Sequence, residues 1–374
     1  MLPEFKLPMA AGDFLARHWQ KTPLFMPGAA RGLEHPSAEL LAALALEDVV
    51  ESRIISGHGD GPWNAQNGPF SEADFNTLPA RYWTLLVQSV DHYLTEVSLL
   101  LDSFDFLPGW RLEDIMISYA AEGGSVGPHF DRYDVFLLQA HGTREWHIGP
   151  TCDATTPLLD HAQLKLIDGM PVEQTFVASP GDVLYLPPGV GHWGTARDSD
   201  CVTWSVGFRA PALVDVLDRL ADEAARGGAD SLFTDPARTR PEDNTRLGAN
   251  DQQMLVDQAL TLLDSNVRRN ALSALLSESR QPDGLDFAID CGHIAASSPS
   301  ATLVRHGAAR LLVDDAGGVW LNGEYQALSG SALALAQRLA ARRLYSDDDL
   351  GTLDAAQEAL LDEWIDAGLL AWLE

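Results

Sequence analysis

The sequence predicts an α+β protein, and three observations support this prediction. Aromatic and β-branched residues at 133–139 follow a glycine-rich stretch, which is typical of a buried strand that begins at a turn. A second short apolar run lies at 180–189 between proline and glycine turns. From residue 212 onwards the apolar residues recur instead at helical spacing. Strands with short helices are therefore expected up to about Pro211, and helices after it.

Three residues at these two strands have the pattern of a metal site. His129 and Asp131 precede the first strand, and His192 follows the second. Two imidazoles and one carboxylate on one side of a ferrous ion leave coordination positions open for oxygen and a co-substrate. A lone histidine is more often a core residue bonded to a carbonyl, but the paired motif upstream favours a ligand role for His192. We predict that these three residues bind one iron ion.

A second His-x-Asp sequence occurs at His58 and Asp60. It lies within residues 56–62, which are rich in glycine and have no adjoining apolar run to hold ligands rigidly. We therefore predict a surface loop here and no metal site.

The residues around the metal motif resemble a known family. The stretches that carry the resemblance are residues 127–136 (GPHFDRYDVF), 142–146 (GTREW), the proline-rich strand before His192, and 205–211 (SVGFRAP). They resemble the JmjC-type cupin oxygenases, and most of all the bacterial ribosomal oxygenases. Residues 14–25 also resemble the amino-terminal segment of that family, so the resemblance covers most of the chain.

The resemblance implies a fold and a reaction. The fold would be a double-stranded β-helix, the cupin or JmjC jelly roll. The reaction would be hydroxylation of an arginine in the large-subunit ribosomal protein L-sixteen, with Fe(II) as cofactor and 2-oxoglutarate and oxygen as co-substrates. The resemblance also implies a homodimer formed through the middle helices.

Binding 2-oxoglutarate requires a cation for its distal carboxylate, and arginine offers two parallel hydrogen bonds. Arg144 lies one expected hairpin beyond the metal pair and matches the family's co-substrate arginine. It is alternatively a solvated arginine at a strand end, with Arg132 as the nearby cation. Ser118 and Tyr119, on the strand that enters the glycine turn, are candidates for further hydrogen bonds to the co-substrate.

An arginine side chain in the site would need carboxylates and an aromatic face. Glu122, Tyr133 and Asp134 are close to the metal motif in sequence, and each either recognises the substrate or is structural. Three tryptophans are expected in the core or in cavity walls: Trp146, Trp193 and Trp204.

Composition indicates a soluble chain of two or three units. It has 374 residues, of which 46% are hydrophobic and 21% charged. The sequence has no apolar run of roughly 20 residues and no signal-peptide pattern at its start, so we expect a cytoplasmic protein without membrane contact. Its three cysteines are widely spaced, which favours reduced thiols over disulfides.

The chain is strongly acidic. It has 25 Lys and Arg against 54 Asp and Glu, a formal net charge of −29. This charge disfavours direct nucleic-acid binding and suits a basic ribosomal protein as substrate, although solubility alone also explains it.

Three domains are expected. Residues 1–211 form the JmjC or cupin catalytic domain, and residues 212–300 a helical domain that either mediates dimerisation or packs on the catalytic domain. Residues 301–374 form a winged-helix-like domain. The evidence for the last two is helical spacing at 212–225, 254–263 and 267–276, a hairpin at 310–324, and helices at 331–341 and 354–367. Acidic residues in the last domain weigh against nucleic-acid binding and favour a protein-contact or structural role.

Two other functions stay open. A cupin enzyme of another class that does not use 2-oxoglutarate would need the metal ligands but not Arg144. A non-catalytic ribosome-associated binding protein would need neither.

Overall fold

The computed structural model describes residues 1–33, 36–59, 61–228, 230–239, 245–279 and 302–373. The chain divides into two compact units. The first comprises Met1–Ala210, Arg280–Ala309 and Ala341–Glu374, and the second comprises Pro211–Ser279 and Arg310–Ala340. The first break in the chain falls beside the expected boundary at residue 211, while residues 301–374 contribute to both units. The three-domain division stays a prediction.

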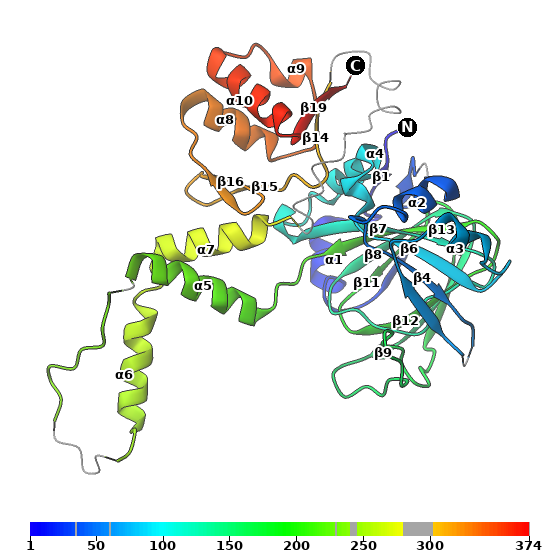
Figure 1. Cartoon of the computed structure of the whole chain (residues 1–374), viewed down its shortest axis with the longest axis horizontal. Helices are drawn as coiled ribbons and strands as arrows, with labels where there is room; N and C mark the ends of the chain where they lie inside the picture. Colours follow the sequence, from blue (N-terminus) through cyan, green and yellow to red (C-terminus); the bar gives the residue numbers. More distant parts are fainter. Residues whose placement is uncertain (34–35, 60, 229, 240–244, 280–301, 374) are drawn as a thin grey trace. The chain divides into compact units, whose positions relative to one another are not determined.

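Two antiparallel sheets form the centre of the first unit (Figure 1). The larger sheet has the order β2-β11-β8-β13-β7-β6-β4-β5, and the smaller has the order β10-β9-β12. The bounds are β2 Leu24–Met26, β4 Ser52–Ser56, β5 Asn64–Asn67, β6 Trp83–Val87, β7 Leu112–Ala120, β8 Val135–His141, β9 Arg144–Thr151, β10 Gln174–Ala178, β11 Val183–Leu186, β12 Val190–Ala196 and β13 Cys201–Phe208. A shared apolar core, which includes Leu137 of β8 and Ile148 of β9, lies between the sheets. This is a double-stranded β-helix, so the predicted fold class is confirmed.

Strand β13 shows why the larger sheet has two different faces. All eight of its residues are buried. Val202, Trp204 and Val206 belong to the main apolar core, whereas Thr203 and Ser205 line a cavity on the other face. Because successive side chains of a strand point to opposite faces, one strand supplies both the core and a polar interior wall.

The other face of the larger sheet is covered by the amino-terminal segment. Helix α1 (Ala11–Arg17) buries Phe14 completely. The Phe14 ring lies 5.0 Å from the Tyr185 ring and 5.7 Å from the Phe136 ring, measured between centroids. This aromatic packing ties the start of the chain to β8 and β11 and stabilises the sheet that carries the site.

The remaining elements of the first unit are short, apart from α10. They are β1 Glu4–Phe5, β3 Ala30–Arg31, α2 Ala38–Leu44, α3 Glu72–Asn76, α4 Thr95–Ser98, three 3-10 turns at 90–92, 99–104 and 109–111, β14 Thr302–Arg305, β18 Leu344–Ser346, α9 Asp347–Leu350, α10 Ala355–Asp366 and β19 Leu370–Leu373. Strands β18, β14 and β19 form one sheet, and Leu99 packs against Val304 and Leu373. The carboxyl-terminal strands are therefore part of the same unit as the β-helix.

The second unit contains three longer helices, a small sheet and one further helix. They are α5 Leu213–Gly228, α6 Ala249–Leu260, α7 Ser265–Ser277, β15 Leu311–Val313, β16 Val319–Leu321, β17 Glu324–Gln326 and α8 Gly330–Leu339. The hairpin of β15 and β16 lies where the sequence predicts one, as do α5, α6, α7 and α8. No helix within the described ranges is long and apolar enough to cross a bilayer.

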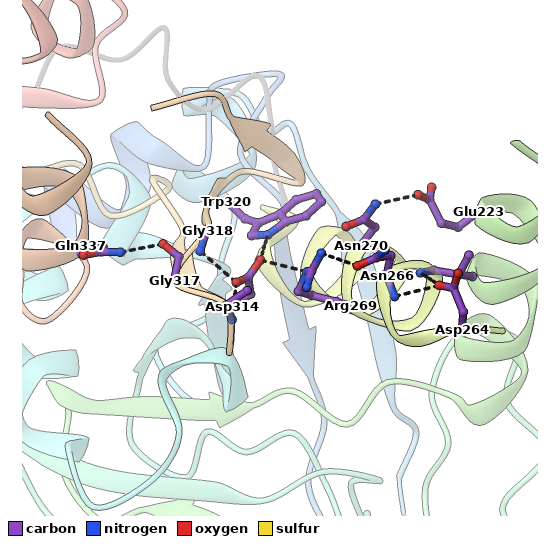
Figure 2. A network of polar contacts seen from close by, with 12 residues as sticks. Glu223, Asp264, Asn266, Arg269, Asn270, Asp314, Gly317, Gly318, Trp320 and Gln337 are labelled. Carbon is purple, nitrogen blue, oxygen red and sulfur yellow. Dashed lines mark hydrogen bonds and ion pairs between the residues drawn. The ribbon is translucent and has the colours of Figure 1, made fainter. Parts of the chain in front are cut away.

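Asp314 is the centre of the polar network that joins the helices and the hairpin of this unit (Figure 2). Its carboxylate accepts hydrogen bonds from Nε1 of Trp320 at 3.0 Å and from the Gly318 N–H at 2.8 Å. Arg269 of α7 lies 3.7 Å from the same carboxylate, and Asn270, also on α7, donates to Glu223 of α5 at 3.1 Å. These contacts fix the hairpin turn against α7.

Burial of Asp314 alone raises the pKa of its carboxyl. The hydrogen bonds from Trp320 and the turn N–H groups, together with the Arg269 charge, outweigh this effect and lower the pKa below its ordinary value of 3.8. The folded protein therefore favours the ionised carboxylate.

Candidate metal centre and co-substrate cavity

His129 and His192 are held together by the backbone. The His129 N–H donates to the His192 carbonyl at 3.0 Å, and the His192 N–H donates to the His129 carbonyl at 2.8 Å. This bridge places His129, which precedes β8, next to His192, which lies in β12. Ligand atoms of His129, Asp131 and His192 all lie within 4.8 Å of one another. The structure thus brings together the three residues that the sequence singles out.

Each imidazole has one nitrogen engaged by the backbone. Nδ1 of His129 lies 2.9 Å from the Gly127 carbonyl, and Nδ1 of His192 lies 3.0 Å from the Val190 carbonyl. A neutral imidazole that donates from Nδ1 keeps the Nε2 lone pair for a metal. Burial, with a smaller contribution from nearby His129, lowers the pKa of His192 to about 4. The ring is therefore neutral near pH 7, as a metal ligand must be.

The glycine turn before the motif is sterically constrained. Gly127 has a φ of +80°, and a Cβ atom there would lie 2.7 Å from Cδ2 of Leu166. A side chain would be excluded both by the backbone conformation and by lack of space. The turn therefore packs directly against the segment that contains Leu166, which also lines the cavity described next.

A cavity of about 440 Å³ opens at the three ligand residues. Arg144, Ser118 and Trp146 line it together with apolar side chains that include Leu137 and Leu164. The cavity therefore combines a metal-binding end, one buried cation and an apolar wall.

Arg144 is buried, with 3% of its surface exposed. Among the described residues, its Nε and Nη2 atoms have no hydrogen-bond partner. Its Cζ atom lies 5.7 Å from the centre of the Trp146 ring. A buried guanidinium without an anion is unfavourable, so these donors fit a ligand carboxylate. The exposed Arg132, the alternative cation, is not among the residues that line the cavity.

Ser118 and Tyr119 point to opposite sides of β7. Ser118 is buried, lines the cavity and donates a hydrogen bond to the Thr203 carbonyl at 3.3 Å. Tyr119 donates to Asp200 at 2.6 Å, away from the cavity lining, and burial together with this bond raises the pKa of its phenol. Only Ser118 is therefore placed to contact a molecule in the cavity.

The candidates for substrate recognition also differ in whether they line the cavity. Asp134 is fully buried and accepts hydrogen bonds from Tyr185 at 2.6 Å, Gln20 at 2.9 Å and Arg111 at 3.1 Å. Its carboxylate is thus part of the core. Glu122 pairs with Arg81 at 2.8 Å and does not line the cavity. Tyr133 lines the cavity and is 43% exposed, which places it at the opening.

The tryptophans and the second histidine motif also have defined positions. Trp204 lies in the main core, Trp146 is in the cavity wall, and Trp193 lies beside His147 with their ring centroids 5.7 Å apart. His58 is exposed in a loop as predicted, while Asp60 lies outside the described residues.

Sequence reasoning missed several cavity residues that come from distant strands. They are Arg53, Ile55, Leu86, Thr203 and Ser205, among others. Thr203 and Ser205 do have a sequence signal, because they alternate with three apolar residues of β13. Arg53 has a weaker one, as a cation that directly precedes the two isoleucines of β4.

The donor set fits a divalent metal that must keep open positions. Two imidazole nitrogens and one carboxylate suit non-haem iron in oxygenases, and the backbone carbonyls orient both rings. The unpartnered Arg144 in the same cavity fits the distal carboxylate of a metal-bound keto acid.

Comparisons with known proteins agree with this geometry. Residues 99–216 match the family model described as JmjC domain. The chain is 38% identical over 247 residues to the ribosomal protein uL16 3-hydroxylase of Escherichia coli, a match that covers 64% of each protein. It is also 38% identical over 210 residues to a probable ribosomal oxygenase of Haemophilus influenzae, of which 52% is covered. The chain thus spans about half to two thirds of these curated relatives.

Solved structures extend the similarity over the whole chain. The X-ray structure of E. coli ycfD has a TM-score of 0.83 at 30% identity, with 99% of this chain and 100% of that chain covered. A structure of YcfD, a ribosomal oxygenase from Escherichia coli, in complex with cobalt and 2-oxoglutarate has a TM-score of 0.81 at 29% identity, with the same coverage. The chain belongs to the ribosomal oxygenase family, whose members carry a JmjC domain.

Proposed function

We propose that this protein is an Fe(II)- and 2-oxoglutarate-dependent hydroxylase that acts on an arginine side chain of a large-subunit ribosomal protein. The observation that carries the proposal is the unpartnered Arg144 in the cavity that also contains His129, Asp131 and His192. The name of the E. coli relative, a ribosomal protein uL16 3-hydroxylase, supports the substrate class. The solved E. coli structure with cobalt and 2-oxoglutarate supports the co-substrate.

His129, Asp131 and His192 would hold the iron. Nε2 of each histidine and a carboxylate oxygen of Asp131 are the donors, and the backbone contacts of both Nδ1 atoms orient the rings. With 2-oxoglutarate and oxygen, ferrous iron supplies an oxidant that hydroxylates an unactivated carbon while 2-oxoglutarate becomes succinate and carbon dioxide. Three protein ligands leave the positions that this chemistry needs.

Arg144 would bind the distal carboxylate of 2-oxoglutarate, and Ser118 on the facing strand would donate its hydroxyl hydrogen to the same carboxylate in place of the Thr203 carbonyl. The planar guanidinium grips a carboxylate through two parallel N–H groups, and the low polarity around a buried group strengthens both bonds. Leu137 and Trp146 form part of the apolar wall of the same cavity, and the Trp146 ring lies beside Arg144. They keep water from competing for the same donors.

The acidic character of the chain suits a basic substrate. A net charge of −29 attracts a positively charged protein at long range and repels nucleic acid. Tyr133, half-exposed at the cavity opening, offers its ring face to the guanidinium of the target arginine. The protein therefore selects a ribosomal protein segment and not ribosomal RNA.

Assembly and location follow from the same proposal. Apolar side chains of α5 are exposed, with Leu213 at 80%, Val214 at 59% and Leu217 at 62%. Such a surface favours an isologous contact with a second copy, so we propose a homodimer formed through the middle helices. A ribosomal protein substrate places the enzyme in the cytoplasm.

One assay distinguishes this function from the two alternatives. The protein is incubated with Fe(II), oxygen and 2-oxoglutarate, with and without a peptide from the ribosomal protein. The hydroxylase forms succinate in step with peptide oxidation. A cupin of another class leaves 2-oxoglutarate intact, and a binding module captures the peptide without changing its mass.

A further inference from the structure

Trp146 lies between the two ends of the cavity. Arg144 and Trp146 are two residues apart on β9, so both point to the inner face of the smaller sheet. The Trp146 ring lies 5.7 Å from Cζ of Arg144 and 6.1 Å from the ring centre of His192. The indole therefore lies beside both Arg144 and His192. The Trp146 residue is buried, with 6% of its surface exposed.

Gly194 on the neighbouring strand makes room for this indole. Trp146 and Gly194 are direct partners in the register of β9 and β12. A Cβ atom at Gly194 would lie 2.5 Å from Cζ3, 2.7 Å from Cη2 and 2.8 Å from Cε3 of Trp146. Gly194 is not among the glycines with positive φ. A side chain at residue 194 is therefore excluded by the Trp146 ring and not by the backbone conformation.

The opposite side of the indole is also occupied. Phe176 of β10 is the register partner of Trp146 on its other flank, and its ring stacks on that of Phe25 with 4.9 Å between centroids. An indole pushed off Gly194 cannot move sideways into this stack without disturbing it. The free direction is inward, into the cavity.

We propose that Trp146, seated on Gly194, is a positioning residue that holds Arg144 and sets the width of the co-substrate cavity. The inference rests on the proposed function, because 2-oxoglutarate is the molecule that would lie between the metal ligands and Arg144. A methyl group at residue 194 lifts the rigid indole into that space. Loss of the ring removes the cation–π contact that orients the guanidinium.

The test is titration of 2-oxoglutarate into the iron-loaded protein without oxygen, followed by the metal-to-ligand absorption band. Gly194→Ala weakens binding by about tenfold or more through overpacking. Trp146→Phe in the Gly194→Ala background removes the clashing benzene ring and recovers most of this loss. Trp146→Leu alone weakens binding by about 5- to 30-fold, because Arg144 loses its ring contact.

Gly207→Ala is the matched control. Gly207 is also a glycine within a strand of the β-helix, but a Cβ atom there would come no closer than 3.5 Å to Asp114. This variant binds 2-oxoglutarate like the unaltered protein. Iron content and circular dichroism of every variant are measured first.

The outcomes distinguish this inference from the proposed function. If the unaltered protein does not bind 2-oxoglutarate, the proposed function is wrong. If it binds, and Gly194→Ala and Trp146→Leu bind equally well, Trp146 has no positioning role. Failure of Trp146→Phe to rescue Gly194→Ala also overturns the inference. If the Gly194→Ala variant does not fold, the Trp146→Leu variant tests the inference by itself. An unchanged affinity for 2-oxoglutarate in Trp146→Leu then contradicts the positioning role of Trp146.

Discussion

His129 and His192 exchange a pair of backbone hydrogen bonds, 3.0 Å and 2.8 Å long, although 62 positions of the chain separate them. Main-chain hydrogen bonds thus hold together the ligand that precedes β8 and the ligand in β12, and the Gly127 and Val190 carbonyls orient the two rings. The spacing of the two imidazoles is set before any metal binds. Such preorganisation favours selective metal binding over a site that forms around the ion.

We predict that His192→Ala abolishes iron binding at stoichiometric concentration and lowers turnover by at least about a hundredfold, because one of three protein ligands is lost. Iron content by elemental analysis and succinate formation measure this. His147→Ala is the control, since His147 is on the same sheet but outside the cavity lining. Full turnover with stoichiometric iron in His192→Ala would show that another residue is the ligand.

We predict that Arg144→Lys weakens 2-oxoglutarate binding by about tenfold and Arg144→Ala by about a hundredfold or more, because lysine keeps the charge but lacks the planar fork. Iron content stays nearly unchanged in both. Anaerobic titration of the iron-loaded variants gives the affinities, with Arg132→Ala as the matched control. Unaltered affinity in both Arg144 variants, with a loss in Arg132→Ala, would move the anchor to Arg132.

Much of the site could be predicted because its signals are local. The ligand pair, the glycine turn and Arg144 lie within a short stretch of sequence, and the strand before His192 has clear turns at both ends. Ser118 and Tyr119 could not be separated, because that choice depends on which face of β7 points inward. Asp134 is adjacent to the motif, yet its carboxylate binds Tyr185 and Gln20 in the core.

The part of the site that could not be predicted depends on which distant strands pair and in which register. Arg53 and Leu86 reach the cavity only because β4 and β6 follow β7 in the sheet order. The role of Gly194 depends on its pairing with Trp146 across two strands. Neither pairing can be predicted from the composition or the residue spacing of one sequence. The helices and the hairpin after residue 211 were predictable because their periodicity is local.

We predict that the unaltered protein is a dimer in solution and that Leu213→Asp with Leu217→Asp makes it monomeric, because charges then replace exposed leucines of α5. Multi-angle light scattering at micromolar concentration gives the mass. Leu158→Asp, at another exposed leucine, is the control and leaves the dimer intact. A monomeric mass for the unaltered protein would contradict a role of the middle helices in dimerisation.

We predict that Asp314→Ala lowers the free energy of unfolding by about 2–4 kcal/mol at pH 7, because the Trp320 and Gly318 donors lose their acceptor. The folded-state pKa of Asp314 lies below 3.8, so its stabilisation is present above that pH and is lost as the pH falls through the folded-state value. Urea unfolding from pH 7 to pH 3 measures both effects, and exposed Asp315→Ala is the control. Equal stability of the Asp314 and Asp315 variants would contradict the assigned role.

The central claim is that the cavity couples 2-oxoglutarate turnover to hydroxylation of a ribosomal protein. Its most direct test is mass spectrometry of a large-subunit ribosomal protein after reaction under isotopically labelled oxygen gas with Fe(II) and 2-oxoglutarate. We predict one labelled oxygen atom on a single arginine residue and one in succinate, with much less of both products from the Arg144→Ala variant at a 2-oxoglutarate concentration that just saturates the unaltered protein. Unlabelled ribosomal protein together with unconsumed 2-oxoglutarate, in an enzyme that holds stoichiometric iron, would contradict the claim.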